Sequence, residues 1–508
     1  MSLKNRENRS KKCLGFKPFR KQFLLLPLLQ LVIFAVIRQT EMLRNEETIC
    51  APATARGGAI SVIRVSGKLT FFICERIFSP TDKNLRFEDQ PGYRSMHGEI
   101  RKGDEIVDEV VVSKFRAPHS YTGEDSVEIS CHASSYIVSR ILESLISEGA
   151  VPALPGEFTR RAFLNGKMDL SQAEAVADLI ASGTRSAHRV AFSQMRGGFS
   201  AEIKSLRNEL LRFASLIELE LDFGEEDVEF ADRKDLMTIV SSVKGMADRL
   251  ADSFRLGNVI RNGIPVAIVG KPNSGKSTLL NTLLNEERAI VSDLPGTTRD
   301  VIEDTIIIHG IEYRFIDTAG LRETSDVIES LGIQKTKEKI MQAALVLLVD
   351  DVSDQAALIN QRAGMVRQMI RGSEKRLVIV INKIDTAGKD VTDKLMQDIS
   401  LENNDSLLFI SAKDHTGLDE LREKLGILVE SDRIDSEDVI VTNVRHSEAL
   451  KHVSESLGRV IAGLEDQLPE DLIAMDIRQA IHYLGEITGE ITSDEILGNI
   501  FRNFCIGK

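Results

Sequence analysis

The sequence predicts a multidomain protein with an α+β N-terminal domain, an α-helical bundle domain, and an α/β domain inserted into the bundle. Three observations support this prediction. The chain has 508 residues, enough for three or four domains. Apolar strands alternate with helices from residue 264 to about 429, which is typical of a parallel sheet with helices on both faces. Purely helical sequence precedes and follows that segment, although two separate bundles would give the same pattern.

Composition and charge narrow the possible functions. The chain is 42% hydrophobic, is 28% charged and has a net charge of -13. Proteins that coat duplex DNA are usually basic, because neutralising phosphates dominates their affinity, so DNA is not an expected partner. Any RNA contact must come from a local basic patch or a basic partner. The five scattered cysteines indicate neither a disulfide framework nor a zinc site and are typical of a reducing, cytoplasmic compartment.

Residues 1–47 form an N-terminal extension unlike the rest of the chain. A basic segment precedes the apolar run Phe23–Ile37, as in a signal peptide, but no A-x-A-like cleavage site follows. The run is short for a membrane span and contains Pro27. Three explanations stay open: a membrane tether, a targeting segment, or upstream sequence translated from a misplaced start, with Met42 as the true start. The misplaced start is the favoured explanation, and a membrane role is less favoured.

Residues 48–167 are expected to form the α+β domain. AISVIRV at 59–65 and EIVDEVVVSKF at 105–115 are rich in β-branched residues and predict strands. SRILESLISEG at 139–149 predicts a helix that ends at its glycine.

Residues 168–262 and 431–508 are expected to form the helical domain. Ser171-Gln-Ala-Glu174 has the spacing of a capping box and predicts a helix start. Farther on, apolar residues recur at steps of three and four, which predicts one buried helix face: Ile203, Leu206, Leu210, Phe213 and Ile217.

Residues 263–430 contain the strongest motif. The segment from Gly270 to Ser277, GKPNSGKS, matches the P-loop pattern G-x-x-x-x-G-K-[ST] and lies between a strand and a helix, as that motif requires. Its backbone N–H groups can surround phosphates, Lys276 can reach the β- and γ-phosphates, and the Ser277 hydroxyl can bind Mg²⁺. The residues predicted to bind phosphate and metal here are Asn273, Ser274, Gly275, Lys276, Ser277 and Thr278.

Three further motifs follow other strands, at the edge where open α/β sheets bind ligands. The motif DTAG would provide Asp317 for the Mg²⁺ shell and the Gly320 N–H for the γ-phosphate. The motif NKID ends at Asp385, whose carboxylate can accept from both N1–H and N2–H₂ of guanine, a pairing that adenine does not offer. The motif SAK follows the strand LLFI. The nucleotide-binding residues in these motifs are Asp317, Thr318, Ala319, Gly320, Asn382, Lys383, Asp385, Ser411, Ala412 and Lys413.

These motifs predict that the nucleotide is GTP, and their order resembles the translation-factor-like GTPases. The usual catalytic residue is missing, however. Ras-like proteins have a water-orienting glutamine directly after D-x-x-G, and this position is Leu321. Nearby charged residues are the alternatives, although each could simply be a solvated surface charge: Arg322, Glu323, Asp326 and Glu329.

Together the motifs resemble one family, the tRNA-modification GTPases MnmE, also called TrmE. The matching stretches span residues 48–508 and include ARGGAISVIRVSG, FRAPHSYTGED, LPGEFTRRAFLNGKMDLSQAEAVADLI, PGTTRD, DTAGLRETSD and CIGK. The resemblance implies a folate-binding N-terminal domain, a discontinuous helical domain and an inserted G domain. It also implies a homodimer. With an FAD-containing partner of the MnmG type, such a dimer would install an aminomethyl-type group at C5 of the tRNA wobble uridine.

The resemblance assigns roles within the G domain. K⁺ would be bound by one side-chain oxygen and three backbone carbonyls, those of Asn273, Ser292, Leu294 and Thr297. Thr298 would complete the Mg²⁺ shell. A cation beside the bridging phosphate oxygen neutralises developing charge as an arginine finger does. The family's catalytic carboxylate falls on Glu329, with Arg322 as a second candidate on the same loop.

The resemblance also implies a site for 5-formyl-tetrahydrofolate or a related reduced folate, formed by Arg64, Glu124, Lys167 and Lys508. Cys505 would then lie beside the one-carbon donor, and we hypothesise that its thiol attacks the uridine ring, which requires a depressed pKa. The alternative is a small buried residue that packs the tail. Prenylation fits poorly, because Ile506 and Gly507 follow the cysteine.

Two other functional classes share some of these features. A ribosome-assembly GTPase switch is expected to carry a basic RNA-binding module, whereas this chain has only the short clusters TRRAFLNGK and RSAHR. A membrane-tethered GTPase depends on residues 1–41 alone. The sequence therefore favours a cytoplasmic GTP-hydrolysing enzyme of tRNA modification.

Overall fold

The computed structural model describes most of the chain, namely residues 46–55, 57–84, 86–87, 89–222, 233–288, 304–316, 337–373, 375–402, 405–430, 439–502 and 504–507. These residues belong to two compact units, one from 1–53 and 60–153, the other from 54–59 and 154–508. The apolar run Phe23–Ile37 lies outside the described residues. Within them, no helix combines the length and hydropathy that crossing a membrane requires.

The first unit is an α+β fold around a seven-stranded sheet of order β3-β4-β5-β6-β2-β1-β7. Apolar residues of α2 and α3 form its core with alternate residues of the strands. The strand predicted at 105–115 is confirmed, and the predicted helix begins earlier, at Ser135. The elements are β1 (Ile49–Pro52), β2 (Ile60–Ser66), α2 (Thr70–Ile77), β3 (Phe78–Pro80), β4 (Arg94–Lys102), β5 (Glu105–Phe115), β6 (Ser126–His132), α3 (Ser135–Ser147) and β7 (Val151–Pro152).

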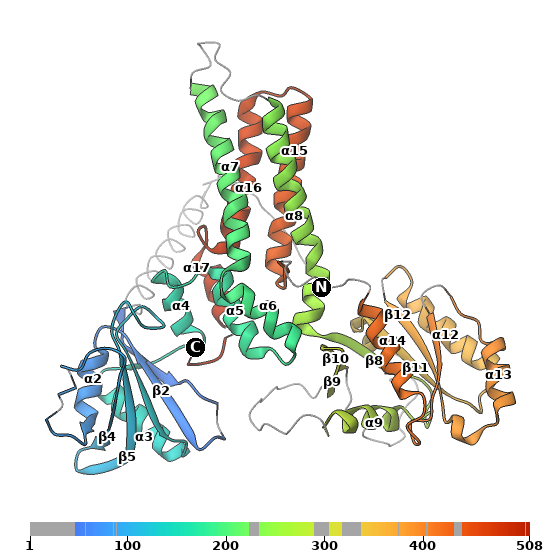
Figure 1. The fold of residues 1–508 in the computed structure, drawn as a ribbon, viewed down its shortest axis with the longest axis horizontal. Helices are drawn as coiled ribbons and strands as arrows, with labels where there is room; N and C mark the ends of the chain where they lie inside the picture. The colour runs from blue at the N-terminus through green and yellow to red at the C-terminus, as the bar shows by residue number, and fades with distance from the viewer. Residues whose placement is uncertain are drawn as a thin grey trace, which may run out of the picture. The chain divides into compact units, whose positions relative to one another are not determined.

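The helical part of the second unit is built from segments far apart in the sequence. Helices α7 and α8 lie beside α15 and α16 in one bundle (Figure 1), although the α/β region separates α8 from α15. The helices are α4 (Glu157–Leu164), α5 (Leu170–Ala181), α6 (Arg185–Met195), α7 (Gly198–Asp222), α8 (Arg233–Asn262), α15 (Val444–Glu465), α16 (Glu470–Thr488) and α17 (Asp494–Arg502).

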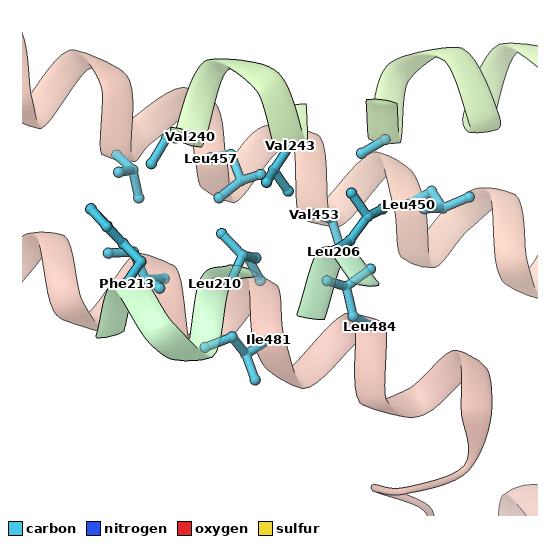
Figure 2. Close-up of a cluster of buried hydrophobic side chains, with 14 of the residues drawn as sticks. Leu206, Leu210, Phe213, Val240, Val243, Leu450, Val453, Leu457, Ile481 and Leu484 are labelled. Atoms are coloured by element: carbon cyan, nitrogen blue, oxygen red, sulfur yellow. The ribbon is translucent and has the colours of Figure 1, made fainter. Parts of the chain in front are cut away.

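One hydrophobic core joins the four bundle helices α7, α8, α15 and α16. Figure 2 shows side chains from each helix pointing toward one another, among them Leu210, Val243, Leu457 and Ile481. The five apolar residues predicted from their spacing in α7 all lie in this core and are at most 1% exposed. Each such large side chain contributes roughly 1.5–3 kcal/mol when it is buried. Both helical stretches of the chain therefore depend on the same core.

The start of α5 differs from the prediction. The N-cap is Asp169, whose side chain accepts a hydrogen bond from the Gln172 N–H at 3.0 Å, while the Asp169 N–H donates to Gln172 Oε1 at 2.9 Å. The predicted capping box at Ser171–Glu174 is therefore wrong. Aspartate is as good an N-cap as serine, and the Ser171 hydroxyl instead donates to Asp169.

Glu174 carries a buried charge that joins the two helical stretches. Its Oε2 lies 2.7 Å from Arg445 Nη2 and 2.7 Å from His446 Nε2, and Asn443 Nδ2 donates to its Oε1 at 3.0 Å. Burial disfavours the charged carboxylate, but the contacts with His446 and Arg445 hold the pKa of Glu174 at about 2. Burial lowers the pKa of His446. The start of α15 is thereby fixed to α5.

The α/β part contains a six-stranded sheet of order β13-β12-β11-β8-β10-β9. One hydrophobic core includes α9 and α14, and a second core on the other face includes α12 and α13, as the alternating pattern predicted. The elements are β8 (Ile264–Val269), α9 (Lys276–Arg288), β9 (Asp304–Ile308), β10 (Ile311–Phe315), β11 (Leu345–Asp351), α12 (Ala356–Ile370), β12 (Arg376–Asn382), η1 (Ile384–Thr386), α13 (Lys389–Asp398), β13 (Asp405–Phe409) and α14 (Leu418–Glu430).

Edge strand β9 departs from the predicted parallel sheet, since it pairs antiparallel with β10. The turn between them is His309-Gly310, with φ of 51° and 81°. Two positive φ values in succession match the twist of a tight hairpin. The strands β8, β10, β11, β12 and β13 run parallel, so their carboxyl ends share one edge.

Glu174→Gln should destabilise the helical region, because Arg445 and His446 would lose the charge that compensates their burial. Breaking a buried pair costs roughly 3–5 kcal/mol. We expect a lower midpoint of thermal unfolding in calorimetry at pH 7. Because the folded pKa of Glu174 is about 2, below its usual 4.5, this stabilisation is present at neutral pH. This stabilisation is lost as the pH falls from about 4.5 toward 2, so the unfolding midpoints of the wild type and Glu174→Gln should converge in that range.

The matched control is Glu218→Gln. Glu218 pairs with Arg478 on the surface of the same bundle, and both side chains are more than half exposed. Exposed pairs contribute about 0–1 kcal/mol, so this variant should unfold almost as the wild type does. If Glu174→Gln and Glu218→Gln lowered the midpoint of thermal unfolding equally, the role assigned to Glu174 would be contradicted.

Candidate nucleotide-binding site

The P-loop connects the end of β8 to α9 and requires glycine at two positions. Gly270 has φ of +144°, and a Cβ there would lie 2.1 Å from the Val349 carbonyl oxygen. Gly275 has φ of +94°, and its Cβ would lie 2.1 Å from Asn382 Nδ2. The loop therefore packs directly against β11 and β12, which holds it at the N-terminus of α9, where helices bind phosphate.

Two side chains of the loop have the chemistry of a phosphate site. Ser274 is fully buried, and among the described residues its hydroxyl has no hydrogen-bond partner. Lys276 Nζ donates to the carbonyl oxygens of Gly270 at 3.0 Å and Lys271 at 2.5 Å. Burial lowers the pKa of Lys276, while the Asp350 carboxylate opposes this. Among the described residues, the hydrogen-bond partners of this ammonium are neutral carbonyls. An ammonium makes stronger hydrogen bonds with an anionic phosphate, so these residues fit the phosphates of GTP.

The buried carboxamide of Asn382 joins the P-loop to the SAK motif. Its Nδ2 donates to the Ser274 carbonyl at 2.9 Å, and its Oδ1 accepts from the Ala412 N–H at 3.0 Å. The next residue, Lys383, has φ of +66° and donates from Nζ to the Asn273 carbonyl at 2.8 Å. The three motifs are thus brought together as the sequence predicted, and one amide side chain fixes their spacing.

Asp385, the predicted guanine reader, is oriented by the SAK serine. The Ser411 hydroxyl donates to Asp385 Oδ1 at 2.6 Å and accepts from the Asp414 N–H at 3.1 Å. The Asp385 side chain is exposed to solvent. A charged carboxylate in a fixed orientation at an open edge of the sheet can accept both guanine donors.

The structure adds a set of ion pairs beside the P-loop that the motifs did not reveal. Lys271 Nζ lies 2.5 Å from Asp354 Oδ1. The Arg362 guanidinium pairs with two carboxylates, that of Asp354 at 2.8 Å and that of Asp350 at 2.9 Å. Burial raises the pKa of Asp350, while Arg362 opposes this rise. Next to it, Asp351 lies 2.7 Å from Lys383 Nζ. The sequence signal was the acidic pair that ends the otherwise apolar strand LVLLVDD.

Several predicted residues lie outside the described part of the chain, so their roles stay predictions. These are Ser292, Leu294, Thr297, Thr298, Asp317, Thr318, Ala319, Gly320, Arg322, Glu329 and Lys508.

The residues predicted for folate fall in both units. In the first, Arg64 lies 2.8 Å from Glu128, and the Ser66 hydroxyl donates to Glu124 Oε2 at 2.7 Å. In the second, Lys167 follows α4.

The Cys505 side chain is exposed, so the alternative of a small buried residue is wrong. The tail is held instead by its backbone, because the Gly156 N–H donates to the Cys505 carbonyl at 3.3 Å. Phe504 packs beside a small apolar core that includes Leu170 and Phe501. This leaves the thiol at the surface.

A P-loop joined through the Asn382 amide to the SAK motif, whose serine orients the carboxylate of Asp385, is the arrangement of a P-loop GTPase. Comparison with known proteins gives the family. A model described as the TrmE N-terminus of GTP-binding proteins matches residues 48–167, and one described as the MnmE helical domain matches 170–505. The compact unit of the structure ends earlier, at Ala153, and the predicted domain bounds stay a prediction.

Curated relatives agree over nearly their whole length. The tRNA modification GTPase MnmE of Bacteroides thetaiotaomicron is 53% identical over 467 residues, 91% of this chain and 100% of the relative. That of Christiangramia forsetii is 52% identical over 476 residues, 92% and 100% of the two chains. This chain belongs to the MnmE family of tRNA modification GTPases. It is a GTP hydrolase that acts in tRNA modification, as the sequence predicted.

Asp385→Asn should change the preferred base. The asparagine carboxamide would place an N–H donor opposite the 2-amino group of guanine, which is also a donor. Xanthine has a carbonyl oxygen at this position and could accept that hydrogen bond. Losing a hydrogen bond to a charged group costs about 1.5–3 kcal/mol, so GTP affinity should fall roughly 10- to 150-fold and xanthosine triphosphate should become a substrate. Competition against a fluorescent nucleotide measures both. Asp390→Asn, at the exposed start of α13, should bind as the wild type does; unchanged GTP affinity in Asp385→Asn would exclude this base-reading role.

Proposed function

We propose that this protein is a K⁺- and Mg²⁺-dependent GTPase that modifies C5 of the tRNA wobble uridine. It acts as a homodimer with an FAD-containing partner of the MnmG type. Together they install an aminomethyl or carboxymethylaminomethyl group, with a reduced folate as the one-carbon donor, in the cytoplasm. The observation that carries the proposal is the combination in one chain of the GTP site with the family's N-terminal and helical domains.

Mg²⁺ would be bound by Ser277 and Thr298, with Asp317 in its outer shell. K⁺ would be bound by the Asn273 side chain and by backbone carbonyls of residues 292, 294 and 297. The backbone at Asn273 is held in a defined conformation, which supports a role of its side chain in binding K⁺. Its φ is +62°, and Lys383 Nζ donates to its carbonyl oxygen. Asparagine adopts this left-handed conformation more readily than most residues. The monovalent cation would neutralise charge that develops during phosphoryl transfer.

Glu329 is the proposed catalytic carboxylate and replaces the glutamine that Leu321 cannot supply. A carboxylate can orient the attacking water by accepting its hydrogen bond. Arg322, which follows the DTAG motif in the sequence, is the second candidate.

A reduced folate would be bound by Arg64, Glu124, Lys167 and Lys508. Glu124 suits this role because Ser66 fixes its carboxylate. The exposed thiol of Cys505 is consistent with a nucleophile for the uridine ring.

The proposal is tested by the nucleoside composition of tRNA from cells that lack this protein. We expect C5-modified wobble uridine to disappear and unmodified uridine to accumulate. Wild-type protein and Lys424→Ala, an exposed control on α14, should restore the modification. Lys276→Ala should not, because the phosphate-binding ammonium is lost. Unchanged nucleosides in the deletion strain would overturn the proposal.

GTP turnover should rise when Na⁺ is replaced by K⁺ at constant ionic strength. An arginine finger in this position contributes about 10³- to 10⁵-fold, and we expect the K⁺ response to exceed 10-fold. Asn273→Ala should flatten the response, whereas Asn208→Ala, an exposed residue of α7, should retain it. Equal rates in the two salts would contradict the K⁺ site.

A further inference from the structure

Helix α6 presents one face that is both basic and aromatic. Arg185, His188, Arg189, Phe192 and Arg196 are all exposed. Spacings of three, one, three and four residues place them along one side of a helix with 3.6 residues per turn. We call these five residues the α6 stripe. It includes the basic cluster RSAHR, which the GTPase site does not use.

The opposite face of α6 is firmly anchored. Val190 is buried against Ile260 and Ile440. The Gln194 side chain is also buried, and its Nε2 donates to the Ile440 carbonyl at 2.7 Å. At the start of the helix, Thr184 Oγ1 accepts from the Ala187 N–H at 3.1 Å. These contacts fix the helix and leave the stripe facing solvent.

The rings within the stripe are ordered against one another. His188 and Phe192 are stacked, with centroids 5.8 Å apart and an interplanar angle of 10°. The Arg196 guanidinium lies 5.8 Å from the centre of the Phe192 ring. Phe192 is still 40% exposed. An exposed aromatic surface beside arginines is the combination on which unpaired bases stack in single-stranded nucleic-acid sites.

The charge of the stripe is not neutralised locally. Residues 179–201 contain no Asp or Glu, although the chain has 77 acidic residues and a net charge of -13. Among the described residues, no carboxylate pairs with Arg185, Arg189 or Arg196, whereas Arg459 and Arg478 on the surface of the bundle do have carboxylate partners. An acidic protein that contacts RNA needs a local basic patch, and this helix face is one.

We propose that the α6 stripe binds the tRNA substrate, with its arginines on backbone phosphates and the His188–Phe192 pair against an unpaired base. This deepens the proposed function and rests on its tRNA substrate. Arginine suits phosphate because the guanidinium can form two parallel hydrogen bonds. An acidic protein segment would satisfy the three charges but leaves the stacked rings without a role, so the composition of the stripe favours RNA.

The test measures binding of the full chain to a tRNA transcript between 50 and 200 mM salt, by fluorescence anisotropy. In Arg185→Gln/Arg189→Gln/Arg196→Gln, affinity should fall at least 10-fold at the low-salt end. Each phosphate contact contributes about 0.7–0.9 to the slope of log affinity against log salt, so losing three contacts should make the slope shallower by about two to three. Phe192→Ala should weaken binding several-fold with the slope unchanged. GTP turnover without tRNA should be unaffected in both variants.

The matched control is Arg212→Gln/Arg249→Gln/Arg371→Gln, which removes the same charge from exposed positions on α7, on α8 and just after α12. It should keep most of the affinity. If the wild type binds tRNA and the stripe variant behaves like this control, the stripe proposal is wrong and the proposed function stands. If the wild type does not bind tRNA even with its flavoprotein partner, both are overturned. If the stripe variant loses only binding to polyglutamate, the partner is an acidic protein and the proposal fails.

Discussion

The core shared by α7, α8, α15 and α16 is the constraint on which the second unit depends. Residues before and after the α/β region bury their side chains in the same core, so the GTP-binding region must begin and end at one bundle. The Glu174–Arg445 pair adds a charged contact between residues 271 positions apart. Because removing one partner leaves a buried charge without compensation, this contact resists any arrangement in which the two helical stretches separate.

Within the α/β region, a few polar contacts hold the nucleotide motifs in register. Asn382 satisfies a carbonyl of the P-loop and an N–H of the SAK motif at once. Ser411 orients Asp385 from the same strand end. The loop is further braced from its other side, through Lys271 and Asp354, to α12. The P-loop, NKID and SAK residues are held in this way without nucleotide, so binding energy is not spent on assembling that part of the site.

The overall charge of the chain and the local charge of helix α6 have opposite signs. A net charge of -13 disfavours indiscriminate binding to nucleic acids, because like charges repel the phosphate backbone. Under the proposal above, the basic face of α6 would attract RNA locally, and its arginines sit on a helix anchored by Val190 and Gln194. Such a patch would favour a particular RNA shape over general affinity for RNA.

Short sequence patterns were enough to predict the nucleotide motifs, the strands that precede them and one buried helix face. The P-loop, NKID and SAK motifs and the strand that precedes each were evident from the sequence, because each is a short segment whose chemistry and conformation depend on its neighbours in the chain. The apolar spacing in α7 likewise predicted its buried face. The family could be recognised for the same reason, since the motifs occur in a fixed order.

Other features were decided only by the tertiary structure. Glu174 has the spacing of a capping residue, but Asp169 caps the helix and Glu174 binds Arg445. The Asp350–Arg362 pair, the antiparallel strand β9 and the exposed side of α6 were also not evident. Each depends on which distant segment packs against the residue. Burial and pairing of charges are set by contacts across the fold, whereas a motif is set by the residues within it.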